Sequence, residues 1–250
     1  MTSNRSESQV RPVVVVPTYS ERENIRPLVE QLLASHSSLE VLCVDDDSPD
    51  GTGDIADEIA SSEPRFHVLH RTEDRGYARS CRAGLKWCRA QGYDYVLTMD
   101  GDLSHDPAQV PVLLDRAIAG ADLVIGSRYV AGGAIEADWG PVRRAVSERG
   151  SAYARTMIGA PVRDCTSGYR CYRASAVDLV LLDHPRSEGY AFLIESLAAM
   201  HRAGAKIEES PITYVDRRHG QSKISSRIVV EALVETTRLG IARVLSRRIV

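Results

Sequence analysis

The sequence predicts an α/β protein with a mostly parallel sheet and helices on both of its faces. Short apolar runs of strand character alternate with amphipathic segments of helical spacing, which is the pattern of such a sheet. Several of these runs end at acidic or turn-forming residues, where the ligands of parallel sheets bind. The 250 residues, 43% of them hydrophobic and 26% charged, suffice for one large domain with its own core.

The elements are clearest in the first half of the chain. The Val-rich run at 11–17 is typical of a buried strand. Apolar residues at helical spacing predict a helix from about Asn24, which leaves Pro27 in its first turn. Gly92 is expected to end a later helix. The other expected elements are strands at 40–44, 66–69, 93–99 and 122–125, and helices at 52–60, 78–90 and 107–119.

The charge distribution bears on the kind of partner. A net charge of −3 argues against a nucleic-acid-binding protein. The charge is uneven, because residues 217–250 carry eight Lys or Arg and two Glu, whereas the other 216 residues carry 23 basic and 32 acidic groups. An acidic body with a basic C-terminal segment indicates that this segment meets an anionic surface.

Composition also bears on the compartment. No apolar run approaches the roughly 20 residues of a membrane-spanning helix. Residues 1–10 are polar, which predicts a flexible N-terminus without a secretory signal and a cytoplasmic protein. The five cysteines are odd in number and lack Cys-x-x-Cys spacing, which favours reduced, buried thiols over disulfides or a zinc site.

Acidic clusters follow the expected strands. Three aspartates at 45–47 follow the strand at 40–44, and an Asp-Gly-Asp triplet at 100–102 follows the strand at 93–99. At one edge of a sheet these carboxylates would repel one another unless Arg side chains or a divalent cation neutralise them. The triplet suits Mg²⁺, which would bridge it to substrate phosphates, although such triplets also occur by chance in loops. Dinucleotide-binding, P-loop and nucleophile-elbow motifs are absent from the sequence.

Six short motifs and a basic stretch follow one another along the chain. They are PTYSE at 17–21, VDDDSPDG at 44–51, MDGDLSH at 99–105, GSRY at 126–129, DCTSGYR at 164–170, PITYVDR at 211–217 and DRRHGQSK at 216–223. Together they resemble the inverting nucleotide-sugar glycosyltransferases of the GT-A (Rossmann-like) fold. Within that group the chain is similar to the polyprenol-phosphate (dolichol-phosphate) mannose synthases, from about Arg11 to Arg238.

The resemblance implies a set of site residues. Asp100 and Asp102 would hold a divalent metal, Mg²⁺ or Mn²⁺, and the catalytic residues would be Asp102, Arg128 and Arg217. Carboxylates and an aromatic face would grip the base and ribose, whereas the metal, Arg and Lys would neutralise the diphosphate. The implied nucleotide-sugar-binding residues are Pro17, Tyr19, Glu21, Asp45, Asp46, Asp100, Gly101, Asp102, Arg128, Arg217 and Lys223.

The implied reaction is transfer of a hexose, mannose from GDP-mannose, onto a polyprenyl monophosphate by metal-assisted inverting displacement. The acceptor is already an anion, so no strong general base is needed. Arg143 and Arg144 are candidate ligands of its phosphate, with a solvated helix face as the alternative. One alternative is the same reaction with another donor, such as UDP-glucose. The other is that the protein is a non-catalytic nucleotide-sugar-binding subunit.

The resemblance divides the chain into a GT-A domain at 11–226 and a basic helical segment at 227–250. That segment would either pack on the domain or hold the enzyme peripherally at the inner face of a membrane through Arg243, Arg247 and Arg248.

Two departures from the family pattern concern the donor. Ser20 stands where the family usually has Asn, and the loop at 74–80 reads DRGYARS in place of a Lys-x-Gly-Leu-Gly-x-Ala-like sequence. Ion pairing offers structural alternatives for two motif residues. Arg128 would form a surface salt bridge with a nearby acid, and Asp164 would pair with Arg170 across the turn between them.

Overall fold

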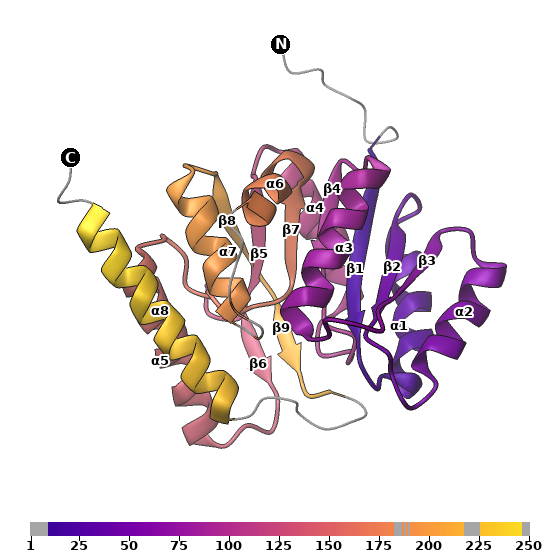
Figure 1. Ribbon diagram of the computed structural model, residues 1–250, viewed down its shortest axis with the longest axis horizontal. Coiled ribbons are helices and arrows are strands. Elements are labelled where there is room, and N and C mark those ends of the chain that lie inside the picture. Colours follow the sequence, from indigo (N-terminus) through magenta and orange to yellow (C-terminus); the bar gives the residue numbers. More distant parts are fainter. Residues whose placement is uncertain (1–9, 183–186, 188, 190, 218–225, 247–250) are drawn as a thin grey trace, which may run out of the picture.

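A computed structural model describes residues 10–182, 187, 189, 191–217 and 226–246. Its main sheet has seven strands in the order β3-β2-β1-β4-β7-β5-β8 (Figure 1). All run parallel except β7, which pairs antiparallel with both β4 and β5. The strands are β1 (Pro12–Thr18), β2 (Glu40–Asp45), β3 (Phe66–His70), β4 (Tyr95–Thr98), β5 (Leu123–Ser127), β7 (Arg170–Arg173) and β8 (Ile207–Pro211). The expected α/β architecture is confirmed.

Helices cover both faces of this sheet. One face carries α1 (Arg22–Ser35), α2 (Thr52–Ser62) and α4 (Val110–Ile118), and the other carries α3 (Tyr77–Gln91), α6 (Ala174–Leu182) and α7 (Ala191–Arg202). A second pair of parallel strands, β6 (Ala134–Glu136) and β9 (Thr213–Val215), lies below the main sheet in Figure 1. Finally, α8 (Ser226–Ser246) packs against α5 (Pro141–Ile158) and α7.

Two helices differ in detail from the expectation. The first begins at Arg22 instead of Asn24, because the carbonyl of Glu21 already accepts the N–H groups of Asn24 and Ile25. Pro27 therefore lies inside the helix and not in its first turn. The helix expected at 107–119 is divided into a 3₁₀ turn at Pro107–Gln109 and α4, which begins just before Pro111.

The core is organised around β1. Val13 and Val15 belong to the hydrophobic cluster under α3, whereas Val14 and Val16 belong to the cluster under α1, as the alternation of a strand buried on both faces requires. All four are fully buried. The five cysteines are buried free thiols, and burial raises the pKa of Cys43 to about 12.

Helix α3 lies unusually close to β1. A Cβ atom added at Gly84 would come within 2.4 Å of Val15 Cγ1, so the absence of a side chain there sets the helix-to-sheet distance. A Cβ added at Gly150, in α5, would meet nothing within 4 Å. The two helical glycines therefore give a matched pair for testing this contact.

We expect Gly84→Ala to destabilise the protein by about 1–2 kcal/mol. Overpacking a core typically costs roughly 1–3 kcal/mol and here outweighs the approximately 1 kcal/mol that Ala gains over Gly in a helix. Gly150→Ala should instead stabilise the protein by about 0.5–1 kcal/mol. Urea denaturation measures both values. Equal stabilisation by the two substitutions would show that α3 does not depend on close approach at Gly84.

Candidate active site

The carboxyl ends of β1, β2 and β4 open onto a pocket of about 510 Å³. It lies where β1 is flanked by β2 on one side and β4 on the other, the point at which ligands bind to open α/β sheets. Its walls also include the loop before α3 and the first turns of α8. The lining residues are Pro17, Thr18, Tyr19, Glu21, Asp46, Arg75, Gly76, Tyr77, Ser80, Asp100, Gly101, Asp102, Gly189, Arg217, Ile228 and Glu231.

Asp100 and Asp102 lie together in this pocket, as the Asp-Gly-Asp motif predicts. Asp100 Oδ1 accepts a hydrogen bond from the Tyr77 hydroxyl at 3.2 Å, and its Oδ2 lies 3.7 Å from His105 Nε2. Burial favours the neutral acid, but the hydrogen bond and charge of His105 outweigh it and hold the pKa of Asp100 below its usual value. The neighbouring Asp102 is paired with Arg217, whose Nη2 lies 3.2 Å from its Oδ2.

Arg217 reaches Asp102 because β9 docks onto the loop that carries the triplet. The N–H of Val215 donates to the carbonyl of Ser104, and Tyr214 forms a bridge with His105. The rings of Tyr214 and His105 also meet edge to face, with centroids 5.6 Å apart. Two residues beyond this strand, Arg217 therefore stands over the acids that follow β4.

The acids after β2 take separate roles. Asp46 lines the pocket, but it accepts hydrogen bonds from the Arg71 guanidinium and from the N–H of Gly76. Asp45 is buried next to the pocket and is not among the residues lining it. Its carboxylate accepts hydrogen bonds from the hydroxyls of Ser48 and Thr18, so it holds the turn after β2.

Three of the other predicted donor residues line the pocket at the end of β1. Pro17 and Tyr19 form part of the wall, and the side chain of Tyr19 is 43% exposed. Glu21 is buried, and its Oε2 accepts a hydrogen bond from Asn24 at 2.7 Å. Gly101 separates the two acids of the triplet, whereas Lys223 lies outside the described residues.

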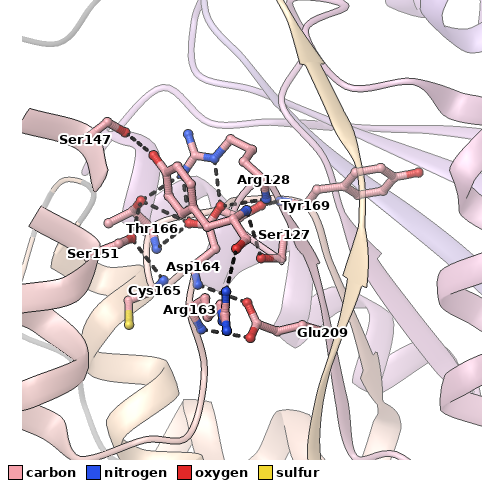
Figure 2. Close-up of polar contacts among 12 residues, drawn as sticks. Ser127, Arg128, Ser147, Ser151, Arg163, Asp164, Cys165, Thr166, Tyr169 and Glu209 are labelled. Atoms are coloured by element: carbon pink, nitrogen blue, oxygen red, sulfur yellow. Dashed lines mark hydrogen bonds and ion pairs between the residues drawn. The ribbon is translucent and has the colours of Figure 1, made fainter. Parts of the chain in front are cut away.

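Arg128 occupies a different position from the one expected of a phosphate ligand. Its guanidinium forms a two-pronged ion pair with the fully buried Asp164, at 2.7 and 2.8 Å, and donates to Thr166 at 2.9 Å (Figure 2). It is not among the residues lining the pocket. Arg128 therefore pairs with an acid, but the pair is buried and is not the surface salt bridge that the alternative described.

The partner expected for Asp164 is wrong, because Arg170 does not pair with it. Arg170 is fully buried and donates to the carbonyls of Cys165, Ser167 and Leu193. Burial favours a neutral Asp164, but the charge and hydrogen bonds of Arg128 outweigh it and lower the pKa of Asp164.

The two candidate acceptor ligands lie at the start of α5, outside the pocket. Arg143 stacks on the ring of Trp139 at 4.2 Å. Arg144 donates to the backbone carbonyls of Ile135, Ala137 and Trp139, so it holds the loop between β6 and α5. A role in binding the acceptor phosphate stays a prediction for both.

Comparison with known proteins then decides the family. Residues 13–181 match glycosyl transferase family 2. The chain belongs to this family. It is 44% identical over 233 residues to the undecaprenyl-phosphate mannosyltransferase of Micrococcus luteus, covering 93% of this chain and 95% of the relative. It is 40% identical over 238 residues to the polyprenol monophosphomannose synthase of Mycolicibacterium smegmatis, covering 95% and 89%.

A more distant relative and a solved structure are also similar to this chain. The dolichol-phosphate mannosyltransferase of Pyrococcus furiosus is 34% identical over 230 residues, which cover 90% of this chain and 62% of that protein. Among solved structures, glucosyl-3-phosphoglycerate synthase of Mycobacterium tuberculosis, crystallised with Mn²⁺, UDP and its product, superposes with a TM-score of 0.62. The match covers 96% of this chain and 80% of that one at 22% identity, which shows the fold alone. The expected GT-A fold and glycosyltransferase class are confirmed.

The backbone around the pocket bears on one departure of this glycosyltransferase from its family. Ser20, Asp47 and Leu103 each have φ between 56° and 60°, and they follow β1, β2 and β4 respectively. Among residues other than Gly, Asn adopts this left-handed conformation more readily than Ser does. The Asn that usually stands at the position of Ser20 therefore suits the turn better than Ser does. The backbone N–H of Ser20 donates to Ser48 Oγ.

Sequence reasoning missed several pocket residues. Arg75 and Tyr77 fall in the unusual loop at 74–80, so the departure from the family pattern was a usable signal. Ile228 and Glu231 line the pocket from α8, and no local motif marks them. Their place follows only from how α8 packs across α5 and α7.

The buried ion pair between Arg128 and Asp164 predicts a large stability effect. Asp164→Asn should cost about 3 kcal/mol, because removing one partner leaves a buried charge unpaired. Asp178→Asn is a matched control, since Asp178 pairs with Arg89 at 2.8 Å with both side chains partly exposed, and it should cost less than about 1 kcal/mol. Urea denaturation at pH 7 measures the unfolding free energy of both variants.

The ion pair between Arg128 and Asp164 also predicts how the stability of the protein depends on pH. Because the pKa of Asp164 is lowered by folding, its stabilisation is complete above the ordinary Asp value of 3.8 and is lost as the pH falls through the folded-state value. The difference in unfolding free energy between wild type and Asp164→Asn should therefore become smaller below about pH 4. A difference that stays constant down to pH 2 would contradict this assignment.

Proposed function

We propose that this enzyme transfers mannose from GDP-mannose to a polyprenyl monophosphate with the help of a divalent metal. The main support is the pocket that holds Asp100, Asp102 and Arg217 at the carboxyl ends of β1 and β4. The choice of sugar and acceptor rests on relatives at 40–44% identity that are named polyprenol-phosphate or undecaprenyl-phosphate mannosyltransferases. The choice of GDP rests on the motif resemblance alone.

The residues present fit a divalent cation that is shared with a diphosphate. The described residues contain no group of three or more His, Cys, Asp or Glu side chains arranged to hold a metal by themselves. The pocket does hold two carboxylates one residue apart, which are hard oxygen ligands suited to Mg²⁺ or Mn²⁺. Asp100 and Asp102 would hold the cation, and donor phosphate oxygens would complete its ligands. A cation bound there supplies electrostatic stabilisation of the departing nucleoside diphosphate.

The chain's own residues then account for orientation and charge. Tyr19, with its exposed ring, and Glu21 both line the pocket, and in the proposal they would grip the base and ribose. Arg217, which neutralises Asp102 in this structure, would donate to phosphate oxygens as negative charge builds on the leaving group. Arg128 holds the loop of Asp164 and Thr166, which leads to Gly168 beside Asp100, so its proposed contribution is to position that loop.

The acceptor chemistry needs little more from the protein. A phosphate monoester is an anion near neutral pH and attacks the anomeric carbon in line with the departing diphosphate, which inverts that centre. No residue in the proposal therefore acts as a general base. Approach of an anion to an acidic pocket does require screening, and Arg143, Arg144 and Lys223 remain the candidate groups for it.

Incubation with radiolabelled nucleotide sugars and polyprenyl phosphate tests the function. With Mg²⁺ or Mn²⁺ present, we expect lipid-extractable label from GDP-mannose at least 10-fold above that from UDP-glucose. A preference for UDP-glucose would move the proposal to a glucosyltransferase. Binding of nucleotide sugars without any transfer would favour the non-catalytic subunit.

Asp102→Asn tests the metal-binding carboxylates. Turnover should fall by at least about 100-fold, or about 2.7 kcal/mol of barrier, because the leaving diphosphate loses its electrostatic stabilisation. Asp178→Asn, at a surface pair away from the pocket, should retain wild-type turnover. Initial rates with saturating donor measure both. Full wild-type activity in EDTA would contradict a role for the metal.

Membrane contact is a further part of the proposal. Among the described residues, no helix is long and apolar enough to span a bilayer. The helices α5 and α8 nevertheless expose apolar side chains that we call the α5–α8 surface, namely Val142, Val146, Val229, Val230, Leu233, Val234, Ile241, Val244 and Leu245. We assign this surface to the inner face of the membrane, where the lipid acceptor is found.

The positions of the basic residues bear on which side chains would carry that contact. Arg243, expected to meet lipid, donates to the carbonyls of Thr156 and Met157 at the end of α5. Arg247 and Arg248 lie outside the described residues. The apolar side chains of the α5–α8 surface therefore carry the proposed attachment, with charge in a secondary role.

We expect the double variant Val234→Asp/Leu245→Asp to bind phosphatidylglycerol vesicles at least 10-fold more weakly than wild type, because two half-exposed apolar side chains become charged. Val112→Asp, at an apolar position on α4 that is 42% exposed, should bind as wild type does. Vesicle co-sedimentation measures this. Transfer to a short, soluble prenyl phosphate should persist in the double variant. Equal loss with soluble and vesicle-embedded acceptors would contradict membrane attachment through this surface.

A further inference from the structure

Tyr77 connects the start of α3 to Asp100. It is the first residue of α3 and lies in the loop at 74–80, where the chain departs from its family. Its ring packs against the hydrophobic cluster on the α3 face of the sheet, and the residue lines the pocket. Its hydroxyl donates to Oδ1 of Asp100 at 3.2 Å.

Gly168 makes room for this hydroxyl. A Cβ atom added at Gly168 would lie 2.7 Å from Tyr77 Oη, which is closer than real Cβ contacts come, and 3.1 Å from Asp100 Oδ1, which is a tight contact. The backbone of Gly168 is fixed in turn, because its carbonyl accepts a 2.7 Å hydrogen bond from Thr98 Oγ1 at the end of β4. The space beside the carboxylate is therefore set by the backbone and is filled by the tyrosine hydroxyl.

The backbone of Tyr77 is tied to the acid that follows β2. The N–H of the preceding residue, Gly76, donates to Oδ2 of Asp46, and Gly76 has a φ of 132° that a side chain would disfavour. Arg71 joins Oδ1 of the same carboxylate to Ser80 in the first turn of α3. A continuous series of contacts thus runs from Asp46 through the start of α3 to Asp100.

The two oxygens of Asp100 consequently have different partners. Oδ1 faces the Tyr77 hydroxyl, and Oδ2 faces His105 Nε2 at 3.7 Å. A carboxylate oxygen has two lone pairs, so a single hydrogen bond to Oδ1 fixes the rotation of the group and leaves a lone pair for a cation. Hydrogen bonds of this kind to metal-binding side chains commonly tune metal affinity.

We propose that Tyr77 is a positioning residue that orients the Asp100 carboxylate for the divalent cation and the donor diphosphate. This rests on the proposed function, because Asp100 must be a metal ligand for its orientation to matter. Tyr77 itself forms no bond to the cation and transfers no proton. The residue thereby links the departure at 74–80 to metal binding at the end of β4.

Tyr77→Phe removes the hydroxyl and keeps the ring. Titration of the full-length protein with MnCl₂ in the presence of GDP, with free Mn²⁺ followed by electron paramagnetic resonance, should give about 10-fold weaker Mn²⁺ binding. Excess Mn²⁺ should restore most of kcat with GDP-mannose. Tyr153→Phe is the matched control, because it removes a hydroxyl that bonds Thr237 at 2.6 Å between α5 and α8, and Mn²⁺ binding should stay at the wild-type value.

Gly168→Ala gives an independent test by crowding the same hydroxyl. It should weaken Mn²⁺ binding in wild type by several-fold and by a smaller factor in the Tyr77→Phe background, since the closer of the two contacts is then gone. Unchanged Mn²⁺ affinity in a folded Tyr77→Phe protein, with wild type binding normally, would overturn the positioning role and leave the proposed function intact. Failure of wild type to bind Mn²⁺ with GDP would overturn both.

Discussion

The crowding of carboxylates at one edge of the sheet is the constraint on which the rest of this structure depends. Parallel strands end together, so the acids that follow β2 and β4 share one edge and would repel one another if left bare. The protein meets this constraint with a separate partner for each acid. Arg71 pairs with Asp46, His105 faces Asp100, and Arg217 pairs with Asp102.

These partners explain features of the fold that would otherwise look unrelated. The short strand β9 brings Arg217 over the triplet, and the bridge between Tyr214 and His105 fixes it there. The loop before α3 is folded around Asp46, which places Tyr77 against Asp100. If the site binds a metal and a diphosphate as proposed, these ion pairs must be able to exchange partners when the ligands enter.

The sequence predicted the fold class, the strands and helices of the first half of the chain and the placement of the Asp-Gly-Asp triplet after a strand. An Asp-Gly-Asp triplet directly after an apolar run is a local signal, and both acids line the pocket as predicted. The ion-pair partner of each charged side chain was harder to predict from the sequence. The sequence predicted Arg128 at the diphosphate, but Arg128 pairs with the buried Asp164. The sequence could not show this, because the choice among possible ion pairs depends on distances in the folded protein.

The same limit applies to contacts made by distant segments. Ile228 and Glu231 line the pocket only because α8 packs across α5 and α7. Asp45 lies in a motif with Asp46, but it is not among the residues lining the pocket, and its Oδ1 accepts hydrogen bonds from the hydroxyls of Thr18 and Ser48. Adjacent residues at a strand end alternate in direction, so a motif identifies the edge of the sheet more reliably than it identifies which acid meets the ligand.

A crystal structure of the protein with GDP and Mn²⁺ tests the central claim most directly, because the anomalous signal of manganese locates the cation without assumptions about its ligands. The account predicts one anomalous peak in contact with the carboxylates of Asp100 and Asp102 and with the diphosphate, and Arg217 moved from Asp102 to a phosphate oxygen. GDP bound in the pocket with no peak beside these two acids, or with Arg217 still paired to Asp102, would contradict it.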